Sequence, residues 1–271
     1  MDNKKVIYYT DELNDEFSEA KIKPRRIDEN YVYVHKNPFW NFCSFLVQNI
    51  FSMPIKVLYS KLKFRHKFVG KEKLKPYKKR GYFIYANHTQ AFADTFIPSL
   101  ANFPKRNFLI VNPENVSMKG MHTLVEMLGA IPIPCNKEGM KNFLEAIKNR
   151  INKGYSITIY PEAHIWPYYT KIRNFKDVSF KYPIELNTPT FCITNTYQAR
   201  GKNKDKIQIV SYIDGPFWGK EDGSDFSKER ALNKKQMQKN LRDKVYETMT
   251  NRSKNSNIEY IKYIHVEWKK Y

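Results

Sequence analysis

The stretch that decides the fold is residues 82–100, YFIYANHTQAFADTFIPSL. Its first five residues form a short apolar run typical of a buried strand, and residues 91–100 have the apolar spacing of a helix. The polar segment between them, which begins at Asn87, is therefore expected where a strand ends and the chain turns into a helix. Open α/β sheets place their functional sites at junctions of this kind.

The same alternation of short apolar runs and helical patterns continues along the chain. Further strands are expected at 107–111, 130–133, 156–160, 190–195 and 207–213, and helices at 116–128, 137–152, 175–186 and 226–248. This order predicts an α/β fold with a largely parallel sheet flanked by helices on both faces. A final edge strand is expected within 258–268, and the Tyr-Val-Tyr-Val run at 31–34 is a candidate for a short strand.

The composition fits a globular protein with a strongly basic surface. Of 271 residues, 41% are hydrophobic and 15% aromatic, which is typical of a folded chain. Lysine and arginine number 47 and aspartate and glutamate 27, so the net charge is +20. Such a charge attracts phosphate-bearing partners, among them anionic lipid headgroups, nucleic acid and polyanionic cofactors.

The cysteines and histidines do not predict a metal site. The three cysteines, Cys43, Cys135 and Cys192, are far apart and odd in number, which favours a reducing compartment over a disulfide framework. No histidine has ligand-like spacing to another histidine or to a cysteine. The first ten residues contain no apolar run, so a secretory signal is not expected.

Three parts of the chain differ in composition. Residues 1–37 are interpreted as a polar leader, loosely held over residues 1–30, residues 38–63 as an amphipathic helical segment, and residues 64–271 as the α/β domain. In the amphipathic segment, apolar residues recur at 39, 42, 43, 46, 47 and 50, and Pro54 is expected to kink or end the helix.

Polar residues interrupt this amphipathic segment, so it is not an ordinary membrane-spanning helix. A basic run follows it, from Lys56 to Arg80. An amphipathic helix beside clustered cations is typical of an interfacial anchor on anionic lipid. The alternative is a helix packed on its own domain with a solvated basic face, and the sequence leaves both open.

Two segments carry residues suited to catalysis. His88 lies at the expected junction between strand and helix, where an imidazole is the natural general base near neutral pH. Asp94 is the candidate to orient its ring. Glu162 follows the strand expected at 156–160 and is a candidate to bind a polar group of an acceptor, or to orient a basic residue. His164 lies two residues further on, either as a second polar contact or as a packed histidine.

Taken together, four segments resemble the glycerolipid acyltransferase superfamily, of the lysophosphatidic acid acyltransferase type. They are Asn87-His88 with Asp94, the run Leu128-Gly-Ala-Ile-Pro-Ile133, Tyr160-Pro-Glu162, and Pro189-Thr-Phe-Cys-Ile193. The resemblance covers roughly residues 65–215. It implies a histidine that deprotonates the acceptor hydroxyl, a supporting aspartate, and an acyl donor carried by coenzyme A or acyl carrier protein.

The chain departs from the family pattern at three places. Five residues separate His88 from Asp94 where the family has four. The basic residue expected after Ile133 is absent, and Lys137 is the nearest cation. The Gly-Thr-Arg that follows the family's glutamate is replaced by Ala163-His-Ile. Arginine binds phosphate well, so these losses bear on the acceptor, for which Lys171, Arg173 and Lys176 are candidate replacements.

The leading hypothesis is an acyltransferase attached peripherally to the cytoplasmic face of an anionic membrane. His88 is the general base, Asp94 its partner, and Glu162, Lys137, His164 and Arg173 are candidates to contact a lysolipid-like acceptor. No bound cofactor is expected. The second hypothesis is a catalytically reduced lipid-binding protein of the same fold. A nucleic-acid binder is not expected, because the cations are spread along the chain without an interleaved aromatic surface.

Overall fold

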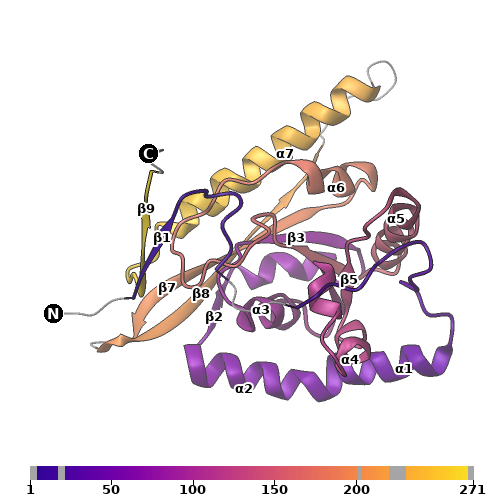
Figure 1. Ribbon diagram of the computed structural model, residues 1–271, viewed down its shortest axis with the longest axis horizontal. Coiled ribbons are helices and arrows are strands. Elements are labelled where there is room, and N and C mark those ends of the chain that lie inside the picture. The colour runs from indigo at the N-terminus through magenta and orange to yellow at the C-terminus, as the bar shows by residue number, and fades with distance from the viewer. Residues whose placement is uncertain (1–4, 18–21, 201–202, 220–229, 268–271) are drawn as a thin grey trace.

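A seven-stranded sheet forms the centre of the molecule (Figure 1). The computed structural model describes residues 5–17, 22–200, 203–219 and 230–267. The strands are β2 (Lys67–Val69), β3 (Tyr82–Ala86), β4 (Asn107–Val111), β5 (Ala130–Pro132), β6 (Ser156–Ile159), β7 (Thr190–Arg200) and β8 (Asn203–Phe217), in the order β2-β8-β7-β3-β6-β4-β5. The pairs between β7, β3, β6, β4 and β5 are all parallel, and only the β7–β8 pair is antiparallel. The predicted α/β class and largely parallel sheet are confirmed.

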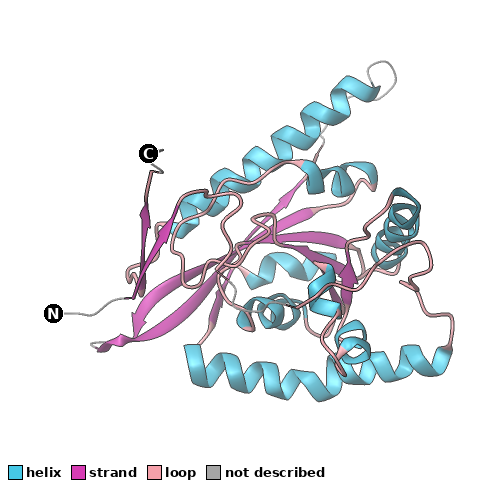
Figure 2. Cartoon of the chain, viewed as in Figure 1, coloured by secondary structure: helices cyan, strands magenta, loops and turns pink. Residues whose placement is uncertain are grey.

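Helices cover both faces of this sheet, as Figure 2 shows. One face packs against α5 (Lys137–Asn152), α6 (Lys181–Glu185) and α7 (Arg230–Ser253), and the other against α2 (Ser52–Phe64) and α3 (Ala93–Asn102). Every residue of β3 and β6 is buried, which is why these strands read as continuous apolar runs rather than alternating ones. Shorter elements are α4 (His122–Met127) and the 3₁₀ turns η2 (Lys71–Tyr77), η3 (Pro113–Val116) and η4 (Val178–Phe180).

Several predicted elements match the structure closely, whereas others are shorter or longer. The helix at 137–152 has the expected limits, because the Asn136 side chain caps it by accepting a hydrogen bond from the Gly139 amide at 2.9 Å. The helix expected at 116–128 is reduced to α4, since Gly120 has a φ of 76° that interrupts it. The helix expected at 175–186 is divided into η4 and α6. Of the helix expected at 226–248, residues 226–229 lie outside the described residues.

The interpretation of residues 1–30 as a loosely held segment is wrong. Strand β1 (Lys5–Tyr9) pairs in parallel with β9 (Ile261–His265), and Ile27 is fully buried. The final edge strand therefore exists, although it pairs with the N-terminal strand and not with the main sheet. The strand expected at 31–34 does not form, since this segment is irregular and Tyr33 packs on Phe143 of α5.

The amphipathic segment is a single helical run of 27 residues, Pro38–Phe64, made of α1 (Pro38–Leu46), the π-helical turn η1 (Val47–Phe51) and α2. It is long and apolar enough to cross a membrane by length and composition. Pro54 does not end it: the wider π turn directly before α2 accommodates a residue that cannot donate a backbone hydrogen bond.

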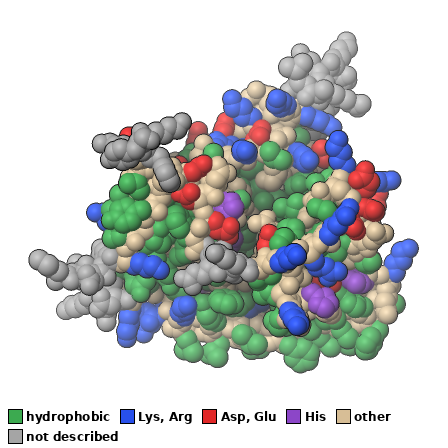
Figure 3. Space-filling model, in the orientation of Figure 1, with side chains coloured by type: hydrophobic (Ala, Val, Ile, Leu, Met, Phe, Trp, Pro, Cys, Tyr) green, Lys and Arg blue, Asp and Glu red, His purple; other side chains and the backbone are tan. Residues whose placement is uncertain are grey.

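This run packs on the domain through its polar side. The buried residues of its inner face are largely polar, namely Ser44, Gln48, Asn49, Met53, Lys56, Ser60 and Phe64. The outer face is apolar and exposed, and comprises Phe39, Phe42, Phe45, Ile50, Phe51, Ile55, Leu58 and Leu62. We call these eight residues the apolar stripe. Hydrophobic side chains gather along the lower edge of Figure 3, where α1 and α2 lie.

Candidate active site

The candidate catalytic residues come from the carboxyl ends of three neighbouring strands. Strand β3 lies between β6 and β7 and is parallel to both. His88 follows β3 by two residues, Glu162 follows β6 by three, and Asn195 lies on β7 beyond its last pairing with β3. The parallel arrangement therefore brings together residues that are more than 100 positions apart in the sequence.

His88 and Asp94 form a hydrogen-bonded pair. His88 Nδ1 and Asp94 Oδ2 are 2.9 Å apart, and 16% of the His88 side chain is exposed while that of Asp94 is fully buried. The additional residue between them is absorbed in the non-helical segment and turn that precede α3, which begins only at Ala93. The five-residue spacing is therefore compatible with the pairing.

The Asp94 carboxylate accepts several further hydrogen bonds. Its Oδ2 accepts from the amides of Thr89 at 2.7 Å and Gln90 at 2.8 Å, and its Oδ1 accepts from Asn195 Nδ2 at 3.3 Å. Together with His88, four donors bond to this one carboxylate. An ionised Asp94 requires His88 to carry its proton on Nδ1, so the lone pair of the neutral ring lies on Nε2. Within the described part of the chain, no group bonds to Nε2.

Tyr160 covers one face of the His88 ring. The two rings stack with centroids 4.4 Å apart and planes 23° apart, and the Tyr160 hydroxyl donates to the Asp94 carbonyl oxygen. The imidazole is therefore held on one face by an aromatic ring and on one edge by a carboxylate. What remains open to a substrate is the edge that carries Nε2.

Glu162 supports the His88 backbone. Its carboxylate accepts hydrogen bonds from the amides of His88 at 2.9 Å and Arg173 at 3.0 Å, and it lies 3.6 Å from the buried Arg173 guanidinium. Burial raises the pKa of Glu162, while Arg173 and the two amides act in the opposite direction. Both side chains of the ion pair are almost completely buried, so neither presents its charge to an open site.

The remaining predicted contacts lie apart from the His88 ring. Lys137 begins α5 and is exposed, beyond the edge strand β5, which two strands separate from β3. His164 is partly exposed, and its Nδ1 lies 3.4 Å from the Glu16 carboxylate. Lys171 and Lys176 are exposed. The structure thus groups His88, Asp94 and Glu162 directly and places the predicted cations either outside this group or buried beneath it.

Asn87 and Asn195 are linked by bonds between side chain and backbone that sequence patterns do not predict. The Asn195 amide donates to Asn87 Oδ1 at 2.8 Å, and Asn87 Nδ2 donates to the Asn195 carbonyl at 3.0 Å. This pair joins the ends of β3 and β7. The only signal in the sequence is a polar residue at the end of an apolar strand, which is too common to single out Asn195.

The backbone amides that directly follow His88 are already used. Those of Thr89 and Gln90 donate to Asp94, so neither is free to stabilise an oxyanion. The loop after Glu162 adopts a left-handed conformation at Ala163, with φ of 63°, at the position where the family pattern carries glycine. In the described residues there is no group of three or more His, Cys, Asp or Glu arranged to hold a metal.

A family model for acyltransferases matches residues 65–195, which contain the His88–Asp94 pair, Glu162 and the strands that position them. This match supports a relation to acyltransferases over that part of the chain. The fold of this chain is similar to the crystal structure of the 1-acyl-sn-glycerophosphate (LPA) acyltransferase PlsC from Thermotoga maritima, with a TM-score of 0.50, 18% sequence identity, and coverage of 86% of this chain and 89% of that chain. The search of curated proteins returned no significant match.

Proposed function

We propose that this protein transfers a fatty acyl group from an acyl thioester to a hydroxyl of a lysophospholipid-like acceptor, with His88 as general base. The observation that carries the proposal is the 2.9 Å contact between His88 Nδ1 and the buried Asp94 carboxylate. It leaves a neutral imidazole with a free Nε2 at a partly exposed position. Family and fold support acyl transfer, and the acceptor and the donor are parts of the proposal.

The proposed reaction needs no nucleophile from the protein. His88 Nε2 accepts the proton of the acceptor hydroxyl as its oxygen attacks the thioester carbonyl, so an oxygen–carbon bond forms. Asp94 stabilises the resulting imidazolium. Collapse of the tetrahedral intermediate breaks the carbon–sulfur bond, and the imidazolium returns the proton to the thiolate of coenzyme A or acyl carrier protein. Atoms and charge balance over the cycle.

We propose that the reaction takes place at an anionic membrane surface, on its cytoplasmic face. The apolar stripe supports this attachment because it is an exposed, continuous face on a helix that holds the protein by its polar side. A stripe of this kind inserts favourably among acyl chains. The helix can contact its own domain and lipid at the same time, because its polar face packs on the domain and the apolar stripe lies on the opposite face.

The test compares purified wild type with His88→Ala and with His164→Ala as control. Each is incubated with acyl-coenzyme A or acyl carrier protein and a panel of lysolipids, and acylated product is quantified. Loss of the general base should lower turnover by about 10²- to 10⁴-fold or more, whereas His164→Ala should retain most of it. Full activity in His88→Ala would show that the base is another group.

The alternative of a catalytically reduced lipid-binding protein predicts a different outcome. Wild type would then bind lysolipid without forming product, and thioester hydrolysis would stay at background. The missing family cations motivate this alternative, since Arg173 is buried and paired with Glu162. The competent His88–Asp94 geometry favours the enzyme.

A further inference from the structure

A basic pocket lies where the carboxyl end of α2 meets the hairpin of β7 and β8, on the left in Figure 1. It has a volume of about 430 Å³ and is lined by Lys61, Arg65, His66, Lys67, Arg200 and Gln208. Four of these six residues are cations, and none of the lining residues in the described part of the chain is acidic. The proposed reaction uses none of them.

The bonds that hold the walls of this pocket use only part of its donors. Gln208 Nε2 donates to the Arg65 carbonyl at 2.7 Å, and one Arg200 nitrogen lies 3.5 Å from the Leu62 carbonyl. The Arg200 Nε is buried and has no hydrogen-bond partner among the described residues. An unpaired guanidinium nitrogen in a cluster of like charges is costly without an anion, so the pocket is suited to a negatively charged ligand.

The backbone of Arg65 supports the same interpretation. It caps α2 in the left-handed region, with φ of 42° and ψ of 41°. Glycine is the residue usually found at this position, because a Cβ is disfavoured there. A large cation at a position that favours glycine points to a role for its side chain.

The pocket is continuous with the apolar stripe. Leu58 and Leu62 are exposed on the last turns of α2, and Leu62 is adjacent to Lys61. A membrane that accepts these leucines would bring its headgroup layer to the level of the pocket. The nearest source of anions is then the phosphate of a lipid headgroup.

We propose that this basic pocket binds the phosphate of an anionic phospholipid headgroup in the membrane on which the apolar stripe rests. The inference extends the proposed membrane attachment and rests on it. The pocket adds selectivity for anionic lipid to an attachment that the stripe alone would make to any bilayer.

The test measures co-sedimentation of the full chain with phosphatidylcholine vesicles, with and without phosphatidylglycerol, in the absence of acyl donor. The site variant is Arg65→Gln with Lys67→Gln. The control, Lys141→Gln with Lys148→Gln, removes the same charge from exposed positions on α5. The site variant should lose about tenfold or more of its affinity for anionic vesicles and keep its affinity for neutral ones, whereas the control should change less than about twofold. Equal losses in the two variants would overturn the proposal in favour of a net-charge effect.

A second variant, Arg65→Gly, guards against misfolding as the cause. Relief of the left-handed conformation should raise the melting temperature, while binding to anionic vesicles falls. A more stable variant with unchanged binding would contradict a role for the side chain.

Two further outcomes separate this proposal from others. If wild type binds neutral and anionic vesicles equally, the proposed headgroup binding in the pocket is wrong, and membrane attachment through the apolar stripe still stands. If wild type binds neither kind of vesicle, membrane attachment is wrong as well. Calorimetry with inorganic phosphate and with coenzyme A shows whether the pocket binds the phosphate of a soluble molecule. If the site variant loses coenzyme A binding but keeps its preference for anionic vesicles, the lipid assignment is wrong.

Discussion

Asp94 lies at the junction of two hydrogen-bonded chains. On one side its Oδ2 accepts from His88 Nδ1, and on the other its Oδ1 accepts from Asn195 Nδ2. The Asn195 oxygen is then free to accept from the Ser211 hydroxyl at 2.5 Å, and Ser211 in turn lies 2.8 Å from His66 Nε2. Since the serine proton is used toward Asn195, His66 must donate from Nε2. One carboxylate thereby sets the tautomers of both histidines.

The variant Asp94→Asn tests this dependence at the catalytic end. An amide does not stabilise the imidazolium, and its NH₂ group favours the wrong tautomer of His88, so we expect kcat to fall about 10³- to 10⁴-fold. Stability should fall by roughly 1.5–3 kcal/mol, because the Thr89 and Gln90 amides lose a charged acceptor. The matched control is Asp214→Asn, which removes another carboxylate, paired with Lys73 and Arg252, away from His88. Comparable kcat losses in the two variants would contradict a specific role for Asp94.

At the other end of this series of hydrogen bonds, His66 should make the stability of the protein depend on pH. Burial, with a smaller effect of Lys71, lowers its pKa from an ordinary 6.5 to about 4. Between these values the unfolded chain binds a proton that the folded protein does not, so stability should fall as the pH drops from about 6.5 to about 4. The contribution is on the order of 3 kcal/mol. In His66→Gln, whose amide can still donate to Ser211, urea unfolding across this range should show a flatter profile, and parallel profiles would refute the assignment.

Within the candidate site, the sequence predicts some residues and misses others. His88 and Asp94 lie at a predicted strand-to-helix junction, which alone is a weak signal, and the resemblance of four segments in order to a known family singled them out. Glu162 was found in the same way, and its ion pair with Arg173 fits the alternative that it orients a basic residue. Its bonds to the backbone amides of His88 and Arg173 were not predicted. Asn195 was missed since its role depends on the pairing of β7 with β3, which no local pattern reveals.

At the scale of elements, the helical run Pro38–Phe64 shows what hydrophobic periodicity does not reveal. The pattern predicted one apolar face, but the π turn η1 shifts the phase, so the exposed face continues through Phe51, Ile55 and Leu58. Nor did the pattern indicate which face meets the domain, because partners for the polar face come from more than 55 residues away. Arg106 donates to Gln48 Oε1 at 2.5 Å and to the Ser44 hydroxyl at 2.6 Å.

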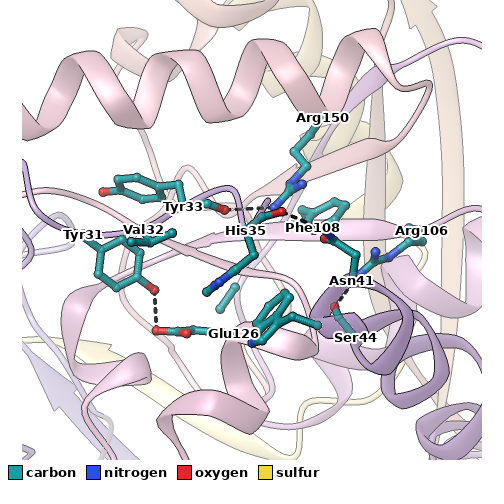
Figure 4. Close-up of a pocket in the computed structure, with 12 residues that line it drawn as sticks. Tyr31, Val32, Tyr33, His35, Asn41, Ser44, Arg106, Phe108, Glu126 and Arg150 are labelled. Atoms are coloured by element: carbon teal, nitrogen blue, oxygen red, sulfur yellow. Dashed lines mark hydrogen bonds between the residues drawn. The ribbon is translucent and has the colours of Figure 1, made fainter. Parts of the chain in front are cut away.

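A small cavity lies beside these contacts, at the amino ends of β4 and β5 (Figure 4). It measures about 20 Å³, which is room for a single water. Its polar groups bond to one another: Tyr31 donates to Glu126 at 2.7 Å, and Arg150 donates to the Tyr33 carbonyl at 3.0 Å. Ser44 of α1 also lines the cavity and bonds to Arg106, so the cavity lies where α1 is attached to the domain.

Substitutions on the two faces of this helical run should affect different properties, membrane binding on the outer face and stability on the inner face. Leu58→Gln with Leu62→Gln alters exposed positions, so stability should change by no more than about 0.5 kcal/mol, whereas partition into vesicles should weaken by roughly 1–2 kcal/mol per leucine. Gln48→Leu leaves Arg106 Nε and the Leu128 carbonyl without their partner, and should cost about 2–4 kcal/mol of stability. Chemical denaturation and vesicle sedimentation measure both. An outward pair as destabilising as Gln48→Leu would show that the stripe packs on protein.

At the scale of the whole molecule, the two ends of the chain meet over the loop that supports His88. Strands β1 and β9 pair, and the Trp166 ring stacks on Tyr263 of β9 with planes 8° apart and lies against Tyr9 of β1. The Trp166 amide donates to the His88 carbonyl at 3.1 Å. The sequence could not predict this arrangement, because two short strands more than 250 residues apart carry no local sign that they pair.

The N-terminal segment bonds to this loop mainly through its backbone. The Asp15 carbonyl accepts from Trp166 Nε1 at 2.8 Å, and the Glu12 carbonyl accepts from Arg173 at 3.3 Å. Trp166 contacts the backbone of His88, and Arg173 pairs with Glu162, which bonds to the His88 amide. Two paths thus connect the N-terminal segment to the position of the His88 ring.

Deletion of residues 1–17 should therefore impair catalysis as well as stability. Without the two carbonyls, Trp166 Nε1 and the Arg173 guanidinium lose partners in a buried setting, so the loop should open more often and His88 should lose its fixed position. We expect kcat to fall at least about tenfold, since small displacements of a catalytic group are costly, and amide hydrogen exchange to accelerate in residues 163–173. Glu12→Gln is the matched control, because it changes the side chain and keeps the carbonyl that Arg173 uses. A truncated protein with normal kcat and unchanged exchange in this loop would show that β3, β6 and β7 position His88 without help from the chain ends.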